Sequence, residues 1–202
     1  MAVLVWFLHS TNHPLIMKVD DDVMLDPRRL DQILDLSLDT SSHCCLPERP
    51  LQPAIWGIWG HILHHIPPQR FGRYAVAEDQ FPGTAYPSYA MGGFYMFSRA
   101  AVTKMLDQYD AGSLVHLEDI AITGQLRERA GLGLVNAWTL ILPWLGNTPI
   151  GEEQIGRSVV VYLQFVQGGQ EGVEAMADWV WNRVWARNYT HIKGGGYHEE
   201  NL

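Results

Sequence analysis

The chain has 202 residues, 47% of them hydrophobic and 18% charged, which is enough for one domain with a sizeable core and too little for two. Its net charge is -8 and its lysines and arginines form no cluster, so the composition argues against a surface built for nucleic acid or for anionic membranes. We therefore expect one domain over residues 1–190, partial at its N-terminus, followed by a flexible, glycine-rich tail over 191–202.

The chain opens on an apolar run, Ala2–Leu8. Periodicity does not decide whether this run is a buried strand or the end of a core helix. It is much shorter than the roughly 20 residues of a membrane-spanning helix, and no basic segment precedes it, so the chain as written shows neither an anchor nor a signal. Because a chain rarely begins inside its own core, we expect that the N-terminal part of a larger domain is missing.

A second apolar run, Leu15–Val19, leads directly into three consecutive carboxylates, Asp20, Asp21 and Asp22. The run predicts a buried strand. Three adjacent like charges are costly to hold together unless a cation binds them. In open α/β sheets ligands bind at the carboxyl ends of strands, which is where these residues lie. The pattern therefore predicts a metal site at the end of this strand.

A helix is expected to follow, because Asp26 and Pro27 are typical of an N-cap and a first helical position. Its apolar face would consist of Leu30, Ile33 and Leu34. The order of strand, acidic turn and helix favours an α/β fold.

The middle of the chain begins with a loop over 38–53 and a predicted strand within Ile55–Ile66. His61, His64 and His65 have spacings seen in metal sites, but no Cys or carboxylate follows at a matching interval. We interpret them as residues that flank a turn.

Gly92 and Gly93 come directly before the apolar segment Phe94–Phe97. Paired glycines at the start of a strand indicate a bulge or a bend, and less often a place where a ligand approaches the backbone. Ser98 then has the properties of a helix N-cap. The helix it would begin carries Val102, Met105, Leu106 and Tyr109 at helical spacing.

Leu117–Ile120 begins another predicted helix, which ends near Gly131 or Gly133. Within it, Asp119 has two interpretations. A carboxylate in a first turn caps the helix, and the same carboxylate in a cleft can accept a proton. Further on, Val173–Arg187 has the apolar periodicity of an amphipathic helix whose tryptophans pack in a core.

Three stretches together resemble the β-1,3-galactosyltransferase family, the inverting glycosyltransferases that include β-1,3-N-acetylglucosaminyltransferases and Fringe. They are residues 18–23 (KVDDDV), 86–98 (YPSYAMGGFYMFS) and 117–120 (LEDI). The resemblance covers about residues 6–130. It implies a GT-A-like nucleotide-sugar transferase fold, that is, an α/β fold with a Rossmann-like mixed sheet flanked by helices.

The resemblance also implies a UDP-sugar donor and manganese, or else magnesium. The family's DxD motif matches Asp20, Asp21 and Asp22, which makes all three candidates for the donor site. By this match Asp22 ligates the metal, and Asp20 lies near the ribose or the metal. Hard oxygen ligands suit either ion.

The remaining family positions supply the rest of the expected site. Asp119 matches the base that deprotonates the acceptor hydroxyl, and Glu118 precedes it. Tyr89, Gly92 and Gly93 match the wall beside the donor sugar and the acceptor. The implied reaction moves a hexose or N-acetylhexosamine to a glycan on a glycoprotein or glycolipid, with inversion, forming a β-1,3 linkage. The implied compartment is the Golgi lumen, for a full-length type II membrane protein whose anchor is absent from this chain.

The chain departs from the family at three points. Phe94 stands where a third glycine is usual, the segment that holds the uracil is missing, and no histidine stands in the late segment around Tyr162. These departures leave open an inactive relative that keeps the fold. A phosphatase-like DxD enzyme is a remote alternative, because Met24 replaces the Thr or Val that such a motif requires. A calcium-binding loop is also remote, because Leu25 replaces its glycine.

Overall fold

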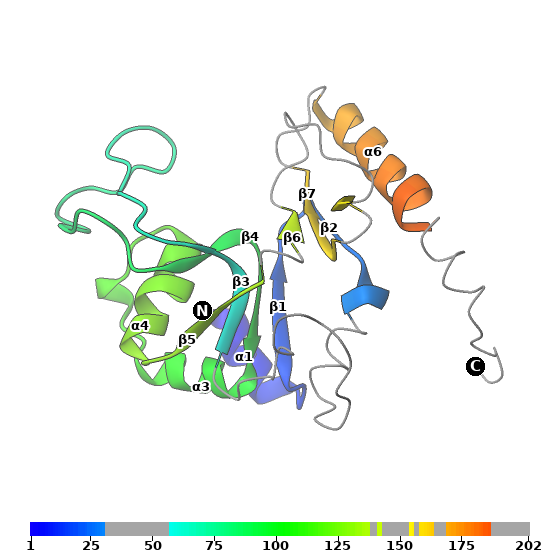
Figure 1. The fold of residues 1–202 in the computed structure, drawn as a ribbon. Helices are drawn as coiled ribbons and strands as arrows, with labels where there is room; N and C mark the ends of the chain where they lie inside the picture. The colour runs from blue at the N-terminus through cyan, green and yellow to red at the C-terminus, as the bar shows by residue number, and fades with distance from the viewer. Residues whose placement is uncertain (31–56, 138–140, 143–153, 156–157, 164–168, 187–202) are drawn as a thin grey trace. The chain divides into compact units, whose positions relative to one another are not determined.

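The computed structural model describes residues 1–30, 57–137, 141–142, 154–155, 158–163 and 169–186. They form two compact units, the first from Met1–Asp20 and Asp31–Trp138, the second from Asp21–Leu30 and Thr139–Leu202 (Figure 1). One domain over 1–190 stays a prediction. The predicted loop over 38–53 and the predicted tail over 191–202 lie outside the described residues.

The first unit contains a four-stranded mixed sheet. Its strand order is β1-β4-β3-β5, with β1 at Leu15–Val19, β4 at Tyr89–Ser98, β3 at Gly57–Leu63 and β5 at Gly133–Asn136. Strand β4 is antiparallel to both β1 and β3, whereas β5 is parallel to β3. The carboxyl ends of β1, β3 and β5 therefore lie at the same edge of the sheet. The prediction of a mixed sheet with helices is confirmed, and the GT-A-like fold itself stays a prediction.

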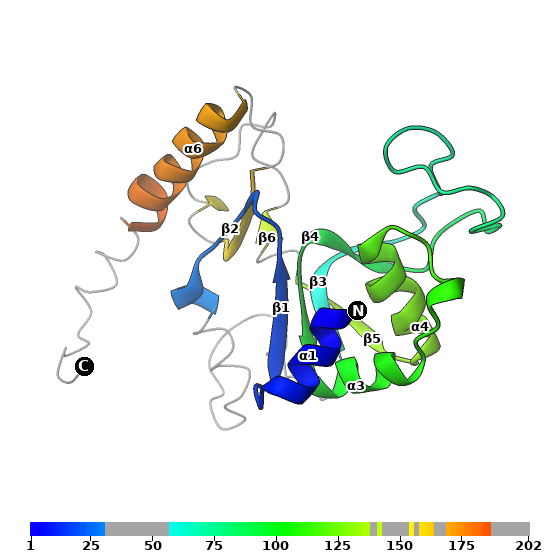
Figure 2. The same ribbon diagram turned by 180° about the vertical axis from the view of Figure 1, so that it is seen from behind.

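One face of this sheet is covered by helices (Figure 2). They are α1 at Ala2–Ser10, α3 at Arg99–Asp107, the π-helical segment η2 at Ile120–Leu126, and α4 at Arg127–Arg129, which continues η2; the short 3-10 turn η1 spans Ala111–Ser113. Tyr95 and Phe97 of the sheet pack in one core with Phe7 of α1, Met105 of α3 and Leu126 of η2. A common core holds these elements together, which is why the end of β1 has a fixed position among them.

The N-terminal run is the helix α1, so of the two alternatives the helix holds. Leu4 and Phe7 are buried, whereas Val3, Val5 and Trp6 are exposed. Helix α1 therefore buries one stripe and leaves the rest of its apolar surface open.

Strand β1 was predicted to be buried, and this prediction is wrong. Met17 and Val19 are 42% and 40% exposed. Among the described residues β1 pairs with β4 alone, so it is an edge strand. An apolar run does not reveal how many neighbours a strand has, and this explains the error.

The glycine pair lies inside β4, at a bulge as predicted. Gly60 and Ile62 of β3 pair with Tyr95 and Ala90 of β4, so His61 alone stands opposite residues 91–94. The extra residues bend β4 where it meets the carboxyl end of β1. At the other end of β4, the Ser98 hydroxyl accepts from the N–H of Ala101 at 3.1 Å and caps α3, also as predicted.

The second unit has a three-stranded sheet of order β2-β7-β6, with β2 at Val23–Leu25, β7 at Val160–Tyr162 and β6 at Ile141–Leu142. The late amphipathic helix is confirmed as α6, Gly169–Trp179, continued by the π-helical segment η3, Val180–Trp185. Trp185 is buried and its indole N–H donates to the carbonyl of Ile155 at 3.0 Å, so this tryptophan packs in a core as expected. Trp181 is 45% exposed, so the prediction is wrong for that residue.

The predicted helix start after the acidic cluster is also confirmed. Asp26 is fully buried, and its carboxylate accepts from the N–H groups of Arg28 and Arg29 at 3.1 and 3.3 Å. The chain is helical over 27–30. The other two residues of the predicted apolar face, Ile33 and Leu34, lie outside the described residues.

Candidate active site

The end of β1 lies beside the glycine pair of β4. Val19 pairs with Phe94, and the N–H of Asp20 donates to the carbonyl of Gly93 at 2.9 Å. Pairing therefore continues one residue past the strand, which places the Asp20 carboxylate next to Gly92. The sequence predicted both features, and the structure brings them together.

Asp21 and Asp22 belong to the second unit and form the turn before β2. Asp21 is exposed and Asp22 is half-buried. The carbonyl of Asp22 accepts from the N–H of Leu163 at 2.8 Å, so its backbone is fixed to the end of β7. Their donor and metal roles stay predictions.

Lys18 is a cation that contacts several of these groups. Its ammonium donates to the carboxylate of Asp20 and to the carbonyl of Gly92, and lies 3.8 Å from the carboxylate of Glu118. It also lies 5.6 Å from the centre of the Tyr95 ring. Lys18 was only part of the family motif in the sequence, with no role assigned. Strand alternation places it on the face of β1 that covers the core, which is the signal that could have identified it.

Of the two interpretations of Asp119, the helix cap is confirmed, and the role of proton acceptor stays a prediction. Its carboxylate accepts from the N–H of Ile120 at 2.8 Å and caps η2. A Cβ added to Gly92 would lie only 3.1 Å from Asp119 Oδ2, so the missing side chain makes room for this carboxylate. Burial raises the pKa of Asp119, while backbone N–H groups, among them that of Gly92, and the charge of Lys18 favour the ionised form.

Glu118 lies beside Asp119 and is nearly half exposed. Burial raises the pKa of Glu118, the charge of Lys18 opposes this effect, and the charges of Asp119 and Asp20 add to it. Lys18 is thus a cation that Asp20, Glu118 and Asp119 have in common, and the N-terminal ammonium also acts on Glu118. A carboxylate held in this way can accept a proton near neutral pH more readily than a fully solvated one.

Thr123 fixes the helix behind Asp119 to the sheet. It is fully buried, and its hydroxyl accepts from the N–H of Ala90 at 2.8 Å. The same hydroxyl lies within donating distance of the carbonyls of Asp119, at 2.7 Å, and Ala90, at 3.2 Å. The backbone of Asp119 is therefore held against β4, two residues from Gly92.

Replacing Thr123 by valine is expected to destabilise the chain by about 1–3 kcal/mol, because the N–H of Ala90 loses its buried acceptor. Urea unfolding of the full chain measures this change. Thr103→Val is the matched control, since the exposed Thr103 hydroxyl only donates to the carbonyl of Arg99 in its own helix. Equal unfolding midpoints for the two variants would contradict the assigned role of Thr123.

Two tyrosines lie behind the carboxylate. Tyr89 is buried, and burial together with the charges of Asp119 and Tyr86 raises the pKa of Tyr89 to about 12. The Tyr86 and Tyr89 rings meet edge to face, with centres 6.4 Å apart. The Tyr86 hydroxyl is buried and has no hydrogen-bond partner among the described residues. Both tyrosines are therefore neutral at physiological pH. The predicted donor contact of Tyr89 stays a prediction.

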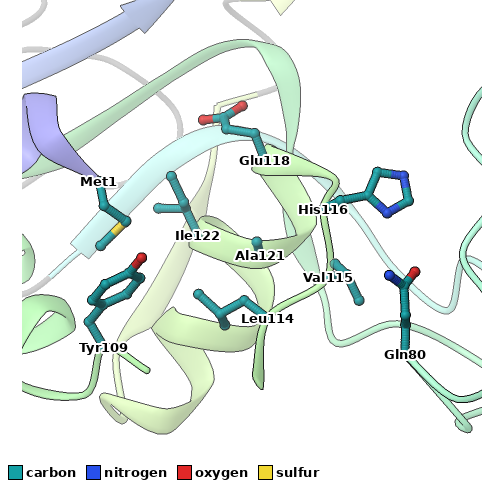
Figure 3. A pocket seen from close by; sticks show the side chains of 9 residues that line it. All are labelled: Met1, Gln80, Tyr109, Leu114, Val115, His116, Glu118, Ala121 and Ile122. Carbon is teal, nitrogen blue, oxygen red and sulfur yellow. The ribbon is translucent and has the colours of Figure 1, made fainter. Parts of the chain in front are cut away.

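Two pockets of the first unit meet at Glu118. A pocket of about 510 Å³ is lined by Lys18, Asp20 and Glu118 together with apolar residues of α1, β1 and β4. A second pocket of about 390 Å³ is lined by Met1, Gln80, Tyr109, Leu114, Val115, His116, Glu118, Ala121 and Ile122 (Figure 3). Figure 3 shows His116 and Tyr109 on opposite sides of the segment that carries Glu118. The charged cluster therefore opens onto space that a ligand can enter.

His64 and His65 flank a turn as predicted, but His61 lies inside β3, so the prediction is wrong for this residue. β3 ends at Leu63, the ring of His64 lies 2.8 Å from the hydroxyl of Ser88, and His65 has the left-handed backbone conformation of a turn, with φ 54°.

Phe94, the departure from the family's third glycine, is 2% exposed, so its ring is packed inside the protein and not in an open pocket.

The side chains at this place match the ligands that the expected metal prefers only in part. Manganese and magnesium take hard oxygen ligands, and magnesium is commonly held by one or two carboxylates together with substrate phosphates. Asp20 and Asp22 carry carboxylate oxygens of that kind. Within the part of the chain that the structure describes, no three His, Cys, Asp or Glu side chains are grouped to hold an ion. The metal stays a prediction that involves these two carboxylates.

Comparison with known proteins identifies the family of the chain. The sequence model of the galactosyltransferase family matches residues 1–137, which include β1, Asp20, the glycine pair and Asp119. The chain belongs to the galactosyltransferase family. The resemblance inferred from the three sequence stretches is thereby confirmed.

A curated relative is the beta-1,3-galactosyltransferase bre-2 of Caenorhabditis elegans, to which the chain is 25% identical over 136 residues. This similarity covers 65% of the chain and 35% of the relative, so the chain matches about a third of that protein's length.

Among the described residues, no helix has the length and apolar character needed to cross a membrane.

Proposed function

We propose that this chain carries the donor-binding residues and the general base of a UDP-sugar-dependent glycosyltransferase. The reaction moves a hexose or N-acetylhexosamine from UDP to a hydroxyl of a glycan acceptor on a glycoprotein or glycolipid, and forms a β-1,3 linkage with inversion. Membership of the galactosyltransferase family supports the class of reaction. The donor, the linkage and the inverted configuration are part of the proposal.

The observation that carries the proposal is the position of Asp119. Its carboxylate lies against Gly92, next to the cluster of Glu118, Lys18 and Asp20 at the end of β1. A partly buried carboxylate that backbone N–H groups hold in one orientation has the properties of a general base. The alternative of a simple cap does not account for the bare glycine that faces it.

In the proposed step Asp119 accepts the proton of the acceptor hydroxyl as that oxygen attacks the anomeric carbon. A bond forms between the acceptor oxygen and the anomeric carbon, and the bond from that carbon to the diphosphate oxygen breaks on the opposite face. The electron pair leaves with UDP, and the configuration inverts. Asp119 then releases its proton to solvent.

Asp20 and Asp22 are the residues that would hold manganese or magnesium. A bound metal would offset the negative charge of the diphosphate. For the complete protein we propose the Golgi lumen as the location, with manganese as its usual cation. The proposal includes no nucleic-acid partner.

The test is incubation of the chain with UDP-galactose or UDP-N-acetylglucosamine, manganese and β-linked acceptors. Transfer is expected in the wild type and not in Asp119→Asn. Absence of product from every donor and acceptor pair, despite metal-dependent UDP binding, would overturn the proposed reaction. Absence of metal-dependent UDP binding would favour the inactive relative, which keeps the fold but has lost donor binding.

Asp22→Asn tests the metal role separately. Calorimetry is expected to show UDP binding that depends on manganese in the wild type, weakened at least about tenfold in the variant, because one hard anionic ligand is lost. Asp107→Asn, at the exposed end of α3, is the control for a lost negative charge. Unchanged binding by Asp22→Asn would remove Asp22 from the metal site.

A further inference from the structure

Lys18 joins three segments of the first unit that are far apart in the sequence. It lies on β1, Gly92 lies on β4, and Glu118 comes just before η2. The side chain of Lys18 is 30% exposed, and its ammonium contacts the Asp20 carboxylate and the Gly92 carbonyl. Glu118 is 3.8 Å away, which is an ion-pair distance. An ammonium has three N–H donors, so contacts of this kind fix its position well.

Gly92 is the point at which this contact reaches the candidate base. Its carbonyl accepts from Lys18, and its N–H favours the ionised form of Asp119. The carbonyl and the N–H belong to the two peptide groups of one residue without a side chain, so a shift at one moves the other. Loss of the Lys18 contact would leave this part of β4, which is bulged, free to move away from Asp119.

We propose that Lys18 is a positioning residue, whose ammonium fixes the Asp20 carboxylate and the Gly92 peptide and so holds the Gly92 N–H against Asp119. The catalytic meaning of this inference rests on the proposed function. Its structural content does not, because it concerns only groups of the protein.

The charges around Asp119 support the same conclusion. Burial raises the pKa of Asp119, and Lys18 is the side-chain cation that opposes this effect. The other groups that favour its ionised form are the N–H groups of Ile120, of Asp119 itself and of Gly92. Glu118, Tyr86 and Tyr89 also face it, and the last two are neutral phenols near pH 7. Removing Lys18 therefore removes both a charge and the support of a donor, and each change raises the pKa of Asp119 further.

The decisive measurement is the titration of the Asp119 carboxyl carbon by NMR in the full chain labelled at aspartate, with the signal assigned from its loss in Asp119→Asn. In Lys18→Met the midpoint is expected at higher pH than in the wild type. Lys104→Met, on the exposed side of α3, is the matched control and is expected to leave the midpoint unchanged. Lys18→Arg retains the charge, so its Asp119 midpoint is expected to lie close to that of the wild type.

A midpoint in Lys18→Met equal to that of the wild type would overturn the inference. If this variant does not fold, Lys18→Gln decides, because it carries no charge and its amide nitrogen ends one bond short of the lysine ammonium, so that both the charge and the contact with the Gly92 carbonyl are lost; its Asp119 midpoint is again expected to rise. The transfer assay separates the two proposals. A shifted midpoint without any transfer by the wild type contradicts the proposed function and supports Lys18, whereas transfer with an unshifted midpoint contradicts Lys18 alone.

Discussion

Replacing Asp119 by asparagine is expected to lower sugar transfer by about 10²–10⁴-fold while leaving the fold intact. Asparagine cannot accept the acceptor's proton. Its side-chain oxygen can still accept from the N–H of Ile120, which the carboxylate contacts at 2.8 Å, so the cap of η2 remains. The variant therefore separates the proposed role of Asp119 as a base from its role as a cap.

The stability of the same variant has a defined pH dependence. Burial raises the pKa of Asp119 above its ordinary value of 3.8, so the folded state holds this proton more tightly than the unfolded state does. Stability is then lost as pH rises from the unfolded pKa through the folded pKa. Asp119→Asn removes this loss. At neutral pH it is expected to be at least as stable as the wild type, and below the unfolded pKa the difference disappears.

Two further variants complete this experiment. Asp119→Ala loses the cap as well and is expected to be less stable by about 0.5–2 kcal/mol. Asp110→Asn is the control, since this exposed aspartate caps η1 in the same way, at 3.1 Å from the N–H of Gly112, and lies outside the cluster. Transfer by Asp119→Asn at the wild-type rate would show that Asp119 is a cap and nothing more.

The pH profile of the wild type gives an independent check. A general base works only in its ionised form, so kcat/KM is expected to fall as pH falls through the pKa of Asp119, which lies above 3.8. An acid limb at the ordinary value would contradict the effect of burial described here.

Local patterns in the sequence predicted the features that depend on neighbouring residues. The strand that ends at Val19, the bulge at the glycine pair and the caps at Ser98 and Asp119 all follow from short-range rules on backbone geometry and hydrogen bonding. Each rule needs only a few consecutive residues, which is why these predictions were accurate. The family resemblance added which of them belong to one site.

Features that depend on distant segments were not predictable. The contact of Lys18 with Gly92 joins residues 74 positions apart. Strand alternation could have assigned Lys18 to the core-facing side of β1, but no local pattern identifies Gly92 as its partner. The edge position of β1 and the burial of Phe94 depend in the same way on which strands become neighbours. The π-helical turn that begins at Ile120 also has no signal in apolar spacing, because it differs from an α-helix only in its hydrogen-bond register.

Replacing Gly92 by alanine is the second change with a large expected effect. The new Cβ would lie 3.1 Å from Oδ2 of Asp119 and 3.5 Å from its Cγ, so the carboxylate must move by a few tenths of an ångström. Catalysis depends on the orientation of the base, and misplacement by 1 Å can cost about a hundredfold. We expect kcat/KM for transfer to fall about tenfold or more, and stability to fall by about 1–3 kcal/mol from overpacking.

Gly133→Ala is the matched control. An added Cβ there meets nothing within 4 Å, and the residue has no left-handed backbone conformation, so neither activity nor stability is expected to change. This control separates the effect of crowding at Asp119 from the general effect of alanine in a strand.

A double-mutant cycle shows whether the cost of Gly92→Ala is transmitted by the carboxylate. In the Asp119→Ala background the Oδ2 and Cγ atoms are absent, and the nearest Asp119 atom that remains is its Cβ, at an ordinary contact distance of 3.5 Å. The stability cost of Gly92→Ala measured by urea unfolding is therefore expected to shrink towards zero in that background. An equal cost in both backgrounds would mean that Gly92 is required by the strand bulge itself. In that case the bare backbone at this position would no longer be evidence for a carboxylate that must be free to act.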